Sequence, residues 1–204
     1  MSAAGDLKPN RLILVRFDNA DTEAIIDLHS DPEVMRFLNG GESTPRNIIV
    51  AETMPLLTDF DVDDVFGFWK VVDSNGTFLG WCSLREPNSS IDPMAAKDAE
   101  IGYRFCRKSW GQGYCSEAML LLIKNCFETT SVQRLIATTY DENLASIRVM
   151  EKLGMTYSRS FKWDASLSPG TTYQTQQVQW SGLDVEYVLE RKDWMAFNHS
   201  DSNG

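Results

Sequence analysis

The chain has 204 residues, of which 43% are hydrophobic and 24% charged. This composition is typical of one well-buried globular domain and leaves little room for a second. Asp and Glu outnumber Lys and Arg by 29 to 19, a formal net charge of −10, which excludes a general nucleic-acid binder because such proteins need a positive surface. The negative charge would suit an amine-bearing partner, but the preferred interpretation is that it keeps the protein in solution.

No apolar run reaches the length of a membrane span, and residues 1–10 lack the basic-then-apolar layout of a signal peptide. Only His29 and His199 could supply imidazole, so we expect no metal. The cysteines form no CxxC pair and fit a reducing compartment: Cys82, Cys106, Cys115 and Cys126. We therefore expect a cytoplasmic protein with no membrane or nucleic-acid partner.

The first third of the chain predicts one strand and three helices. Branched apolar residues favour a strand over 11–17, and apolar spacing favours a helix over 21–30. Asp31-Pro32 combines an Asp N-cap with Pro at the first helical position and opens a second helix that stops near Gly40. A similar signal at Thr44-Pro45 opens a third helix that runs to about Leu57.

The remaining two thirds predict a hairpin followed by alternating strands and helices. Strands over 65–72 and 77–85 flank Asp73-Ser-Asn-Gly76, whose Asn-Gly pair is expected to supply the positive φ angles of a hairpin turn. Further strands are expected over 99–106, 134–139, 155–163 and 184–191, with helices over 113–129 and 143–153. This order predicts a mixed sheet covered by helices, in one domain over 10–195 with flexible termini at 1–9 and 196–204.

The segment from Glu100 to Ala118 carries the chemical signal, because it runs from a strand through a turn of small residues into a helix. Gly111, Gly113 and the small Cys115 let a ligand approach the backbone closely. Free N–H groups and the helix dipole at the following N-terminus favour a phosphate. A plain turn explains the glycines equally well. Neither the P-loop pattern nor a Rossmann glycine pattern is present.

The run Trp110-Gly-Gln-Gly113-Tyr-Cys-Ser-Glu-Ala118 resembles the acyl-CoA pyrophosphate loop of the GNAT superfamily, [Gln/Arg]-x-x-Gly-x-[Gly/Ala]. Trp commonly takes the first place in the branch that includes the ribosomal-protein alanine acetyltransferases, and Cys115 stands where Gly or Ala is usual. Segments 31–37, 143–154 and 184–194 resemble further parts of that branch, in the same order. The resemblance implies a GNAT-like α/β fold with a mixed, mostly antiparallel sheet of about seven strands flanked by helices.

For function, the resemblance implies an N-acetyltransferase that uses acetyl-CoA as co-substrate and transfers the acetyl group directly to a primary amine. It implies main-chain contacts from Phe105, Cys106 and Arg107 to the pantetheine arm. It implies a pyrophosphate site over Trp110, Gly111, Gln112, Gly113, Tyr114, Cys115 and Ser116. Asn143 is implied to face the cofactor, although capping of the next helix is a sufficient reason for it.

The reaction needs a neutral amine, so a base must remove a proton from a group whose pKa is about 10. Glu100 is the candidate base, directly or through water, and strand alternation puts it on the face opposite Ile101. Alternatively, Glu100 is a solvated glutamate or a partner of Arg104. Trp163 and the 164–177 loop are expected to border the acceptor.

Ser146 is the candidate acid, since the resemblance puts a serine there near the sulfur. Many relatives use a tyrosine at the place of Met150, which cannot donate a proton, so water is the alternative acid. Coenzyme A thiolate is a tolerable leaving group in any case. An acyl-Cys115 mechanism is disfavoured, because no His lies nearby in sequence.

Several alternatives stay open at this stage. The acceptor could be a protein N-terminus, an aminoglycoside-like or polyamine amine, or an amino acid. The donor could be longer, such as succinyl-CoA. Because Met150 cannot act as the acid, a different class of function is also open: a non-catalytic acyl-CoA-binding sensor or scaffold. The protein is expected to be a monomer or a homodimer.

Overall fold

The computed structural model describes residues 11–59, 65–86, 97–162 and 182–200. Within these residues, one sheet has seven strands in the order β1-β2-β3-β4-β5-β7-β6. The strands are β1 (Leu12–Arg16), β2 (Gly67–Asp73), β3 (Phe78–Arg85), β4 (Asp98–Phe105), β5 (Arg134–Tyr140), β6 (Thr156–Phe161) and β7 (Asp184–Glu190). Only β4 and β5 pair in parallel. The predicted mixed, mostly antiparallel sheet is therefore confirmed.

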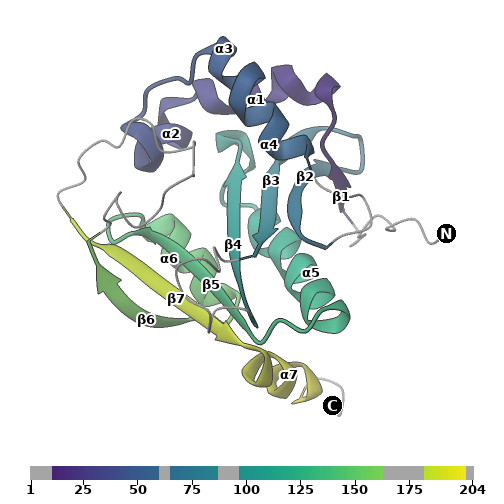
Figure 1. Cartoon of the computed structure of the whole chain (residues 1–204), viewed down its shortest axis with the longest axis vertical. Coiled ribbons are helices and arrows are strands. Elements are labelled where there is room, and N and C mark those ends of the chain that lie inside the picture. The colour runs from purple at the N-terminus through teal and green to yellow at the C-terminus, as the bar shows by residue number, and fades with distance from the viewer. Residues whose placement is uncertain (1–10, 60–64, 87–96, 163–181, 201–204) are drawn as a thin grey trace.

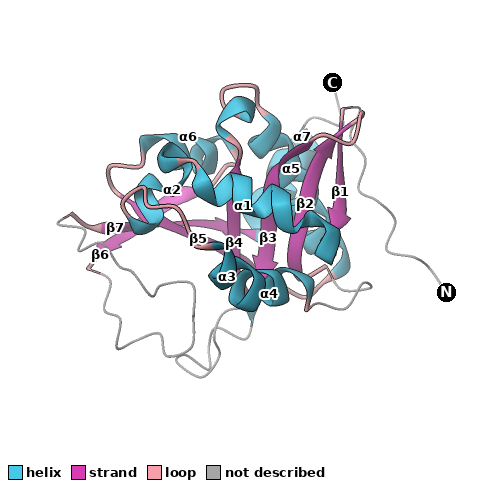
Figure 2. Ribbon diagram, turned by 90° about the horizontal axis from the view of Figure 1, so that it is seen from above, coloured by secondary structure: helices cyan, strands magenta, loops and turns pink. Residues whose placement is uncertain are grey.

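Helices cover both faces of this sheet (Figures 1 and 2). Their bounds are α1 (Thr22–Ser30), α2 (Pro32–Asn39), α3 (Arg46–Ile48), α4 (Met54–Thr58), α5 (Tyr114–Thr129), α6 (Leu144–Lys152) and α7 (Arg191–Ser200). Side chains of α1, α2 and α4 pack with Phe68 and Trp81 in one buried cluster. Those of α5 and α6 pack in a second, larger cluster on the other face.

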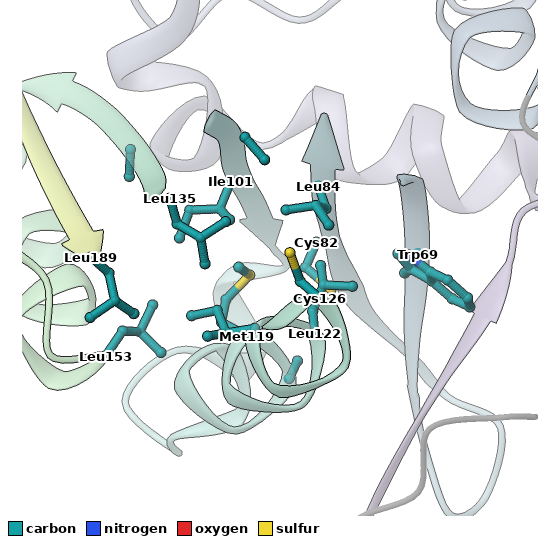
Figure 3. Close-up of a cluster of buried hydrophobic side chains, with 14 of the residues drawn as sticks. Trp69, Cys82, Leu84, Ile101, Met119, Leu122, Cys126, Leu135, Leu153 and Leu189 are labelled. Carbon is teal, nitrogen blue, oxygen red and sulfur yellow. The ribbon is translucent and has the colours of Figure 1, made fainter. Parts of the chain in front are cut away.

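The larger cluster centres on α5, which lies across β3, β4 and β5 (Figure 3). Met119 and Leu122 of α5 have no exposed surface and face Cys82, Ile101 and Leu135 of three neighbouring strands. Full burial of a side chain of this size stabilises the fold by about 1.5–3 kcal/mol. Alternation along β4 thus sends Ile101 toward α5 and leaves Glu100 on the face of α1 and α2, as the sequence predicts.

The predicted helix over 44–57 is interrupted. A π-helical turn, Ile49–Thr53, separates α3 from α4, and the Met54 N–H bonds to the Ile49 carbonyl five residues earlier. Pro55 follows directly and has no N–H with which to continue the regular ladder. Local apolar spacing predicts the helix correctly but does not predict this change of hydrogen-bond period.

The hairpin between β2 and β3 is in the predicted place but has a different turn. Among the described residues only glycines have a positive φ, so Gly76 (φ +80°) adopts it and Asn75 does not. The Gly76 N–H bonds to the Asp73 carbonyl at 3.0 Å, and the Asp73 carboxylate accepts from the Asn75 and Thr77 amides at 2.9 and 2.8 Å. This side-chain contact favours a turn with one left-handed residue.

Helix α7 runs from Arg191 to Ser200, into the segment 196–204 that the sequence analysis expects to be a flexible terminus. The helix is anchored at its start. Arg191 donates to the carbonyls of Val132 and Thr130 at 2.6 and 2.7 Å and also to that of Phe127. The Trp194 ring lies 6.1 Å from the Phe127 ring. These are contacts between distant segments, which local pattern does not reveal.

A buried histidine joins the helices of one face to β4. His29 of α1 is 1% exposed, and its Nε2 lies 2.6 Å from Nη1 of Arg104. Its Nδ1 lies 3.3 Å from the Thr44 hydroxyl. Because Arg104 can only donate, Nε2 is the acceptor and the ring is neutral. Burial, and then the charge of Arg104, lower the pKa of His29 from 6.5 to about 2.

This histidine should make stability depend on pH. The unfolded chain binds a proton at His29 below its ordinary pKa of 6.5 while the folded chain does not, so the stabilisation is present above that pH and lost as pH falls. We expect the free energy of unfolding to drop by about 1 kcal/mol between roughly pH 6.5 and 5.5 from this group alone. Urea unfolding of wild type and His29→Gln measures it. Equal pH slopes in both proteins would contradict the assignment.

Candidate active site

The sheet opens between β4 and β5. The two strands pair only through Asp98–Arg134, Ala99–Leu135 and Glu100–Ile136. Beyond that point β5 stays paired with β7 along its whole length, whereas β4 continues beside β3 alone. The strands therefore meet at one end and separate toward the other (Figure 1). Glu100 is the last paired residue of β4 and stands at the fork.

The glycine turn lies at the open end, between β4 and α5. Gly111 (φ +72°) and Gly113 (φ +79°) both adopt the left-handed region. A Cβ added at Gly111 would meet no atom within 4 Å, whereas one added at Gly113 would lie 3.4 Å from the Arg11 guanidinium, so the space beside Gly111 is open. The N-terminus of α5 begins at Gly113 and has no side-chain cap. This combination of free space and uncapped N–H groups fits a phosphate.

Hydrogen bonds hold the turn in shape. The indole N–H of Trp110 donates to the Phe105 carbonyl at 2.8 Å, and the side-chain amide of Gln112 donates to Lys108 O at 2.7 Å. Cys106 N–H bonds to Leu79 O of β3 at 2.9 Å, so alternation turns the main-chain groups of Phe105 toward the opening. The Phe105 ring itself is buried in the core, so a packing role and a main-chain role are compatible.

Arg11, just before β1, also contacts the turn, a role that no local sequence pattern predicts. Its guanidinium donates to Glu117 of α5 at 2.6 Å and to the Gln112 carbonyl at 3.0 Å. It also lies 4.6 Å from the centre of the Tyr114 ring. Arg11 thereby compensates the carboxylate of Glu117, which would otherwise repel an anion at this helix terminus.

Glu100 forms an ion pair with Arg85 rather than with Arg104, the partner that the sequence suggests. Its carboxylate lies 2.9 Å from Nη2 of Arg85, and both side chains are about one third exposed (38% and 35%). Arg104 instead contacts His29 and is buried. Strand pairing opposes Arg85 to Glu100 directly, so the ion pair follows from register, which the sequence did not specify. Glu100 remains accessible to water and to a substrate.

Asn143 and Ser146 form the start of α6 on the other side of the opening. The Asn143 side chain accepts from Ser146 N–H at 3.3 Å and donates to the Thr139 hydroxyl at 3.0 Å. The capping role predicted for Asn143 is therefore present. The Ser146 hydroxyl lies 2.9 Å from the hydroxyl of Tyr103, which comes from β4. Sequence reasoning assigned no role to Tyr103.

Met150 and Cys115 both lie near this site, but neither is suited to act as an acid or a nucleophile. Met150 is 1% exposed and part of the larger cluster, and its thioether has no proton to donate. Burial, and then the neighbouring Cys82, raise the pKa of the Cys115 thiol well above its ordinary value. A thiol that stays protonated is a weak nucleophile, which argues physically against an acyl-cysteine intermediate.

The described residues contain neither a cluster of metal-ligating side chains nor a membrane-spanning helix. No three His, Cys, Asp or Glu side chains come close enough together there to hold a metal ion. No helix in the same residues is long and apolar enough to cross a membrane. The candidate site therefore combines three features: a fork between the parallel strands β4 and β5, a glycine turn at the N-terminus of α5, and the Glu100 carboxylate at the fork.

Comparison with known proteins agrees with this class. The family model of the acetyltransferase (GNAT) domain matches residues 11–156. The chain is 27% identical over 197 residues to the FsC-acetyl coenzyme A-N(2)-transacetylase of Aspergillus fumigatus, covering 96% of this chain and 80% of that protein. An acetyltransferase (GNAT family) from Bacillus anthracis is 24% identical, with a TM-score of 0.69 and coverage of 92% and 99%. Spermidine N-acetyltransferase from Vibrio cholerae, solved with CoA and spermine, is 13% identical, with a TM-score of 0.67 and the same coverage.

The chain therefore belongs to the GNAT acetyltransferase family and is an acetyl-CoA-dependent acyltransferase. The family resemblance found in the sequence is confirmed at this level. The finer resemblance to the ribosomal-protein alanine acetyltransferase branch is not confirmed, because the relatives described above carry other names. Trp163 and the loop 164–177 lie outside the described residues.

The raised pKa of Cys115 predicts a slow thiol. We expect iodoacetamide to modify Cys115 in the folded protein at least about tenfold more slowly than in the urea-unfolded chain near neutral pH, since each unit of raised pKa lowers the thiolate fraction tenfold. Peptide mass spectrometry with time measures the rate. Modification as fast as that of the unfolded chain would make Cys115 a reactive thiol and reopen the acyl-cysteine mechanism.

Proposed function

We propose that the protein transfers the acetyl group of acetyl-CoA directly to a primary amine, within a single catalytic domain over residues 10–195. The observation that carries the proposal is the fork of β4 and β5 at Glu100, with Ser146 on the other side of the opening. A base on one face and a hydroxyl donor near the other suit attack on a thioester held between the strands. No covalent enzyme intermediate is needed.

The cofactor would lie along the open edge of β4. Main-chain groups of Phe105, Cys106 and Arg107 would contact the pantetheine arm. The pyrophosphate would sit on the turn and the first amides of α5, at Trp110, Gly111, Gln112, Gly113, Tyr114, Cys115 and Ser116. Asn143 would support this edge by holding the start of α6. When bound, the cofactor supplies an activated acetyl group.

Glu100 would accept the proton of the attacking amine, directly or through a water molecule. Its exposure favours the role, because a fully buried carboxylate could not exchange its proton with solvent. Ser146 would donate a hydrogen bond to the sulfur as the C–S bond breaks.

A small-molecule amine is the acceptor that the comparisons support best. The Aspergillus fumigatus relative, which this chain matches over 96% of its length, is named for transfer to an N(2) position. The acidic net charge of −10 also favours a cationic acceptor. A protein N-terminus is the second acceptor class, and a non-catalytic acyl-CoA sensor is the alternative function, motivated by the buried Met150.

An acceptor screen separates these possibilities. Release of CoA thiol is followed with α-amino compounds, polyamines, aminoglycosides and N-terminal peptides, using acetyl-CoA and succinyl-CoA as donors. Turnover with any small amine supports the proposal, and turnover with peptides alone would move it to protein acetylation. Tight binding of acetyl-CoA without turnover on any amine would favour the sensor.

Two glycines offer a matched test of the pyrophosphate site. Gly111 and Gly76 both have a positive φ, and a Cβ at either would meet nothing within 4 Å. Each Gly→Ala variant should therefore lose about 1 kcal/mol of stability from backbone strain. Only Gly111→Ala should weaken CoA binding by calorimetry, by about tenfold or more, because its methyl group enters the proposed phosphate space. Equal CoA affinities in both variants would remove the pyrophosphate from this turn.

Glu100→Gln tests the base. We expect kcat/KM to fall by about 10²–10⁴ near neutral pH, with the loss shrinking as pH approaches the amine pKa of about 10, where no base is needed. The control is Glu128→Gln, an exposed glutamate 3.9 Å from Lys124 at the far end of α5. A pH-independent loss, or none, would exclude Glu100 as the base.

A further inference from the structure

Tyr103 is the one described side chain of β4 whose hydrogen bond reaches across the opening to α6. Its hydroxyl lies 2.9 Å from the Ser146 hydroxyl and 3.1 Å from the Ser146 carbonyl. Tyr103 lies three residues beyond the fork at Glu100, where β4 no longer pairs with β5. Its ring packs against the larger cluster, on the face of α5 and α6. The bond therefore joins β4 to the start of α6 beyond the point where β4 and β5 separate.

The two hydroxyls have two possible hydrogen-bond arrangements. In a closed arrangement Tyr103 donates to the Ser146 carbonyl and accepts from the Ser146 hydroxyl, so no proton is left for a ligand. In an open arrangement Tyr103 donates to the Ser146 hydroxyl, whose own proton is then free to point elsewhere. Negative charge near Ser146 favours the open arrangement, because it attracts that proton.

The phenol is suited to donate in this pair. Burial raises the pKa of Tyr103 above its ordinary value of 10, so the group keeps its proton across the working range of most enzymes. Serine alone orients poorly, since its hydroxyl rotates freely. A fixed donor on the serine oxygen turns the serine proton outward and strengthens the bond it donates.

We infer that Tyr103 is a positioning residue for the leaving group, which acts through Ser146 and supplies from β4 the phenolic hydroxyl that the buried Met150 of α6 cannot supply. This inference rests on the proposed function. As the amine nitrogen bonds to the acetyl carbon and the C–S electron pair moves to sulfur, Ser146 donates a hydrogen bond to the sulfur and Tyr103 donates one to Ser146. Neither residue loses its proton. The amine proton goes to Glu100 or water, and the thiol is protonated from solvent.

The test measures the thiol of bound CoA rather than turnover. Ultraviolet absorbance of the thiolate is followed against pH for the CoA complex, with the desulfo-CoA complex subtracted to remove the protein cysteines and tyrosines. We expect Tyr103→Phe to raise the bound thiol pKa by about one to two units, the size of one lost hydrogen bond to a charged group. Ser146→Ala should raise it at least as much, and the double variant no further.

A matched tyrosine–serine pair provides the control. Tyr157 lies 2.7 Å from the Ser160 hydroxyl on the exposed strand β6, and Tyr157→Phe should leave the thiol pKa unchanged. Calorimetry with desulfo-CoA should give the same affinity for Tyr103→Phe as for wild type. A thiol pKa unmoved by Tyr103→Phe, or equal losses of CoA and desulfo-CoA affinity, would reduce Tyr103 to a structural role and overturn the inference. Failure of the wild type to bind either ligand would overturn the proposed function as well.

Discussion

The limited pairing of β4 with β5 is the constraint from which the site follows. Each of these strands has another partner: β4 pairs with β3 along most of its length, and β5 pairs with β7 throughout. Two antiparallel blocks therefore meet through three parallel residue pairs only. Separated strands leave main-chain groups unpaired, and such groups need partners when they are covered. An extended, amide-bearing ligand can supply such partners, so the opening costs the fold hydrogen bonds and is the place where the proposed cofactor would bind.

Helix α5 makes this opening compatible with a stable protein. Its buried residues contact strands of both blocks, so the hydrophobic core holds together what the hydrogen-bond ladder leaves apart (Figure 3). The same helix presents its N-terminus at the open end, after the glycine turn. Packing and the proposed phosphate site thus use different parts of one helix, and Arg11, just before the first strand, donates a hydrogen bond to the turn. Glu100 and Tyr103 lie on opposite faces of β4 because side chains alternate along a strand.

Local patterns predicted much of this architecture. The Asp31-Pro32 start of α2 is confirmed by the Asp31 side chain that accepts from Glu33 N–H at 2.9 Å. The glycine turn and the order of strands and helices are also predicted correctly, because turn residues and the spacing of apolar residues are local properties of the sequence. What the sequence did not reveal depends on contacts between distant segments. Arg11 reaches Glu117 across 106 positions, and Tyr103 reaches Ser146 across 43. The register of β3 and β4 pairs Glu100 with Arg85, and the packing of α1 on the sheet brings His29 to Arg104.

Hydrogen–deuterium exchange with and without CoA tests the central claim most directly. If the opening between β4 and β5 and the turn before α5 bind the cofactor, CoA will slow exchange of amides 105, 107 and 114–116 and leave the hairpin at 73–77 unchanged. Slowed exchange confined to other elements, or no change at saturating CoA, would contradict the account and separate the open sheet from cofactor binding.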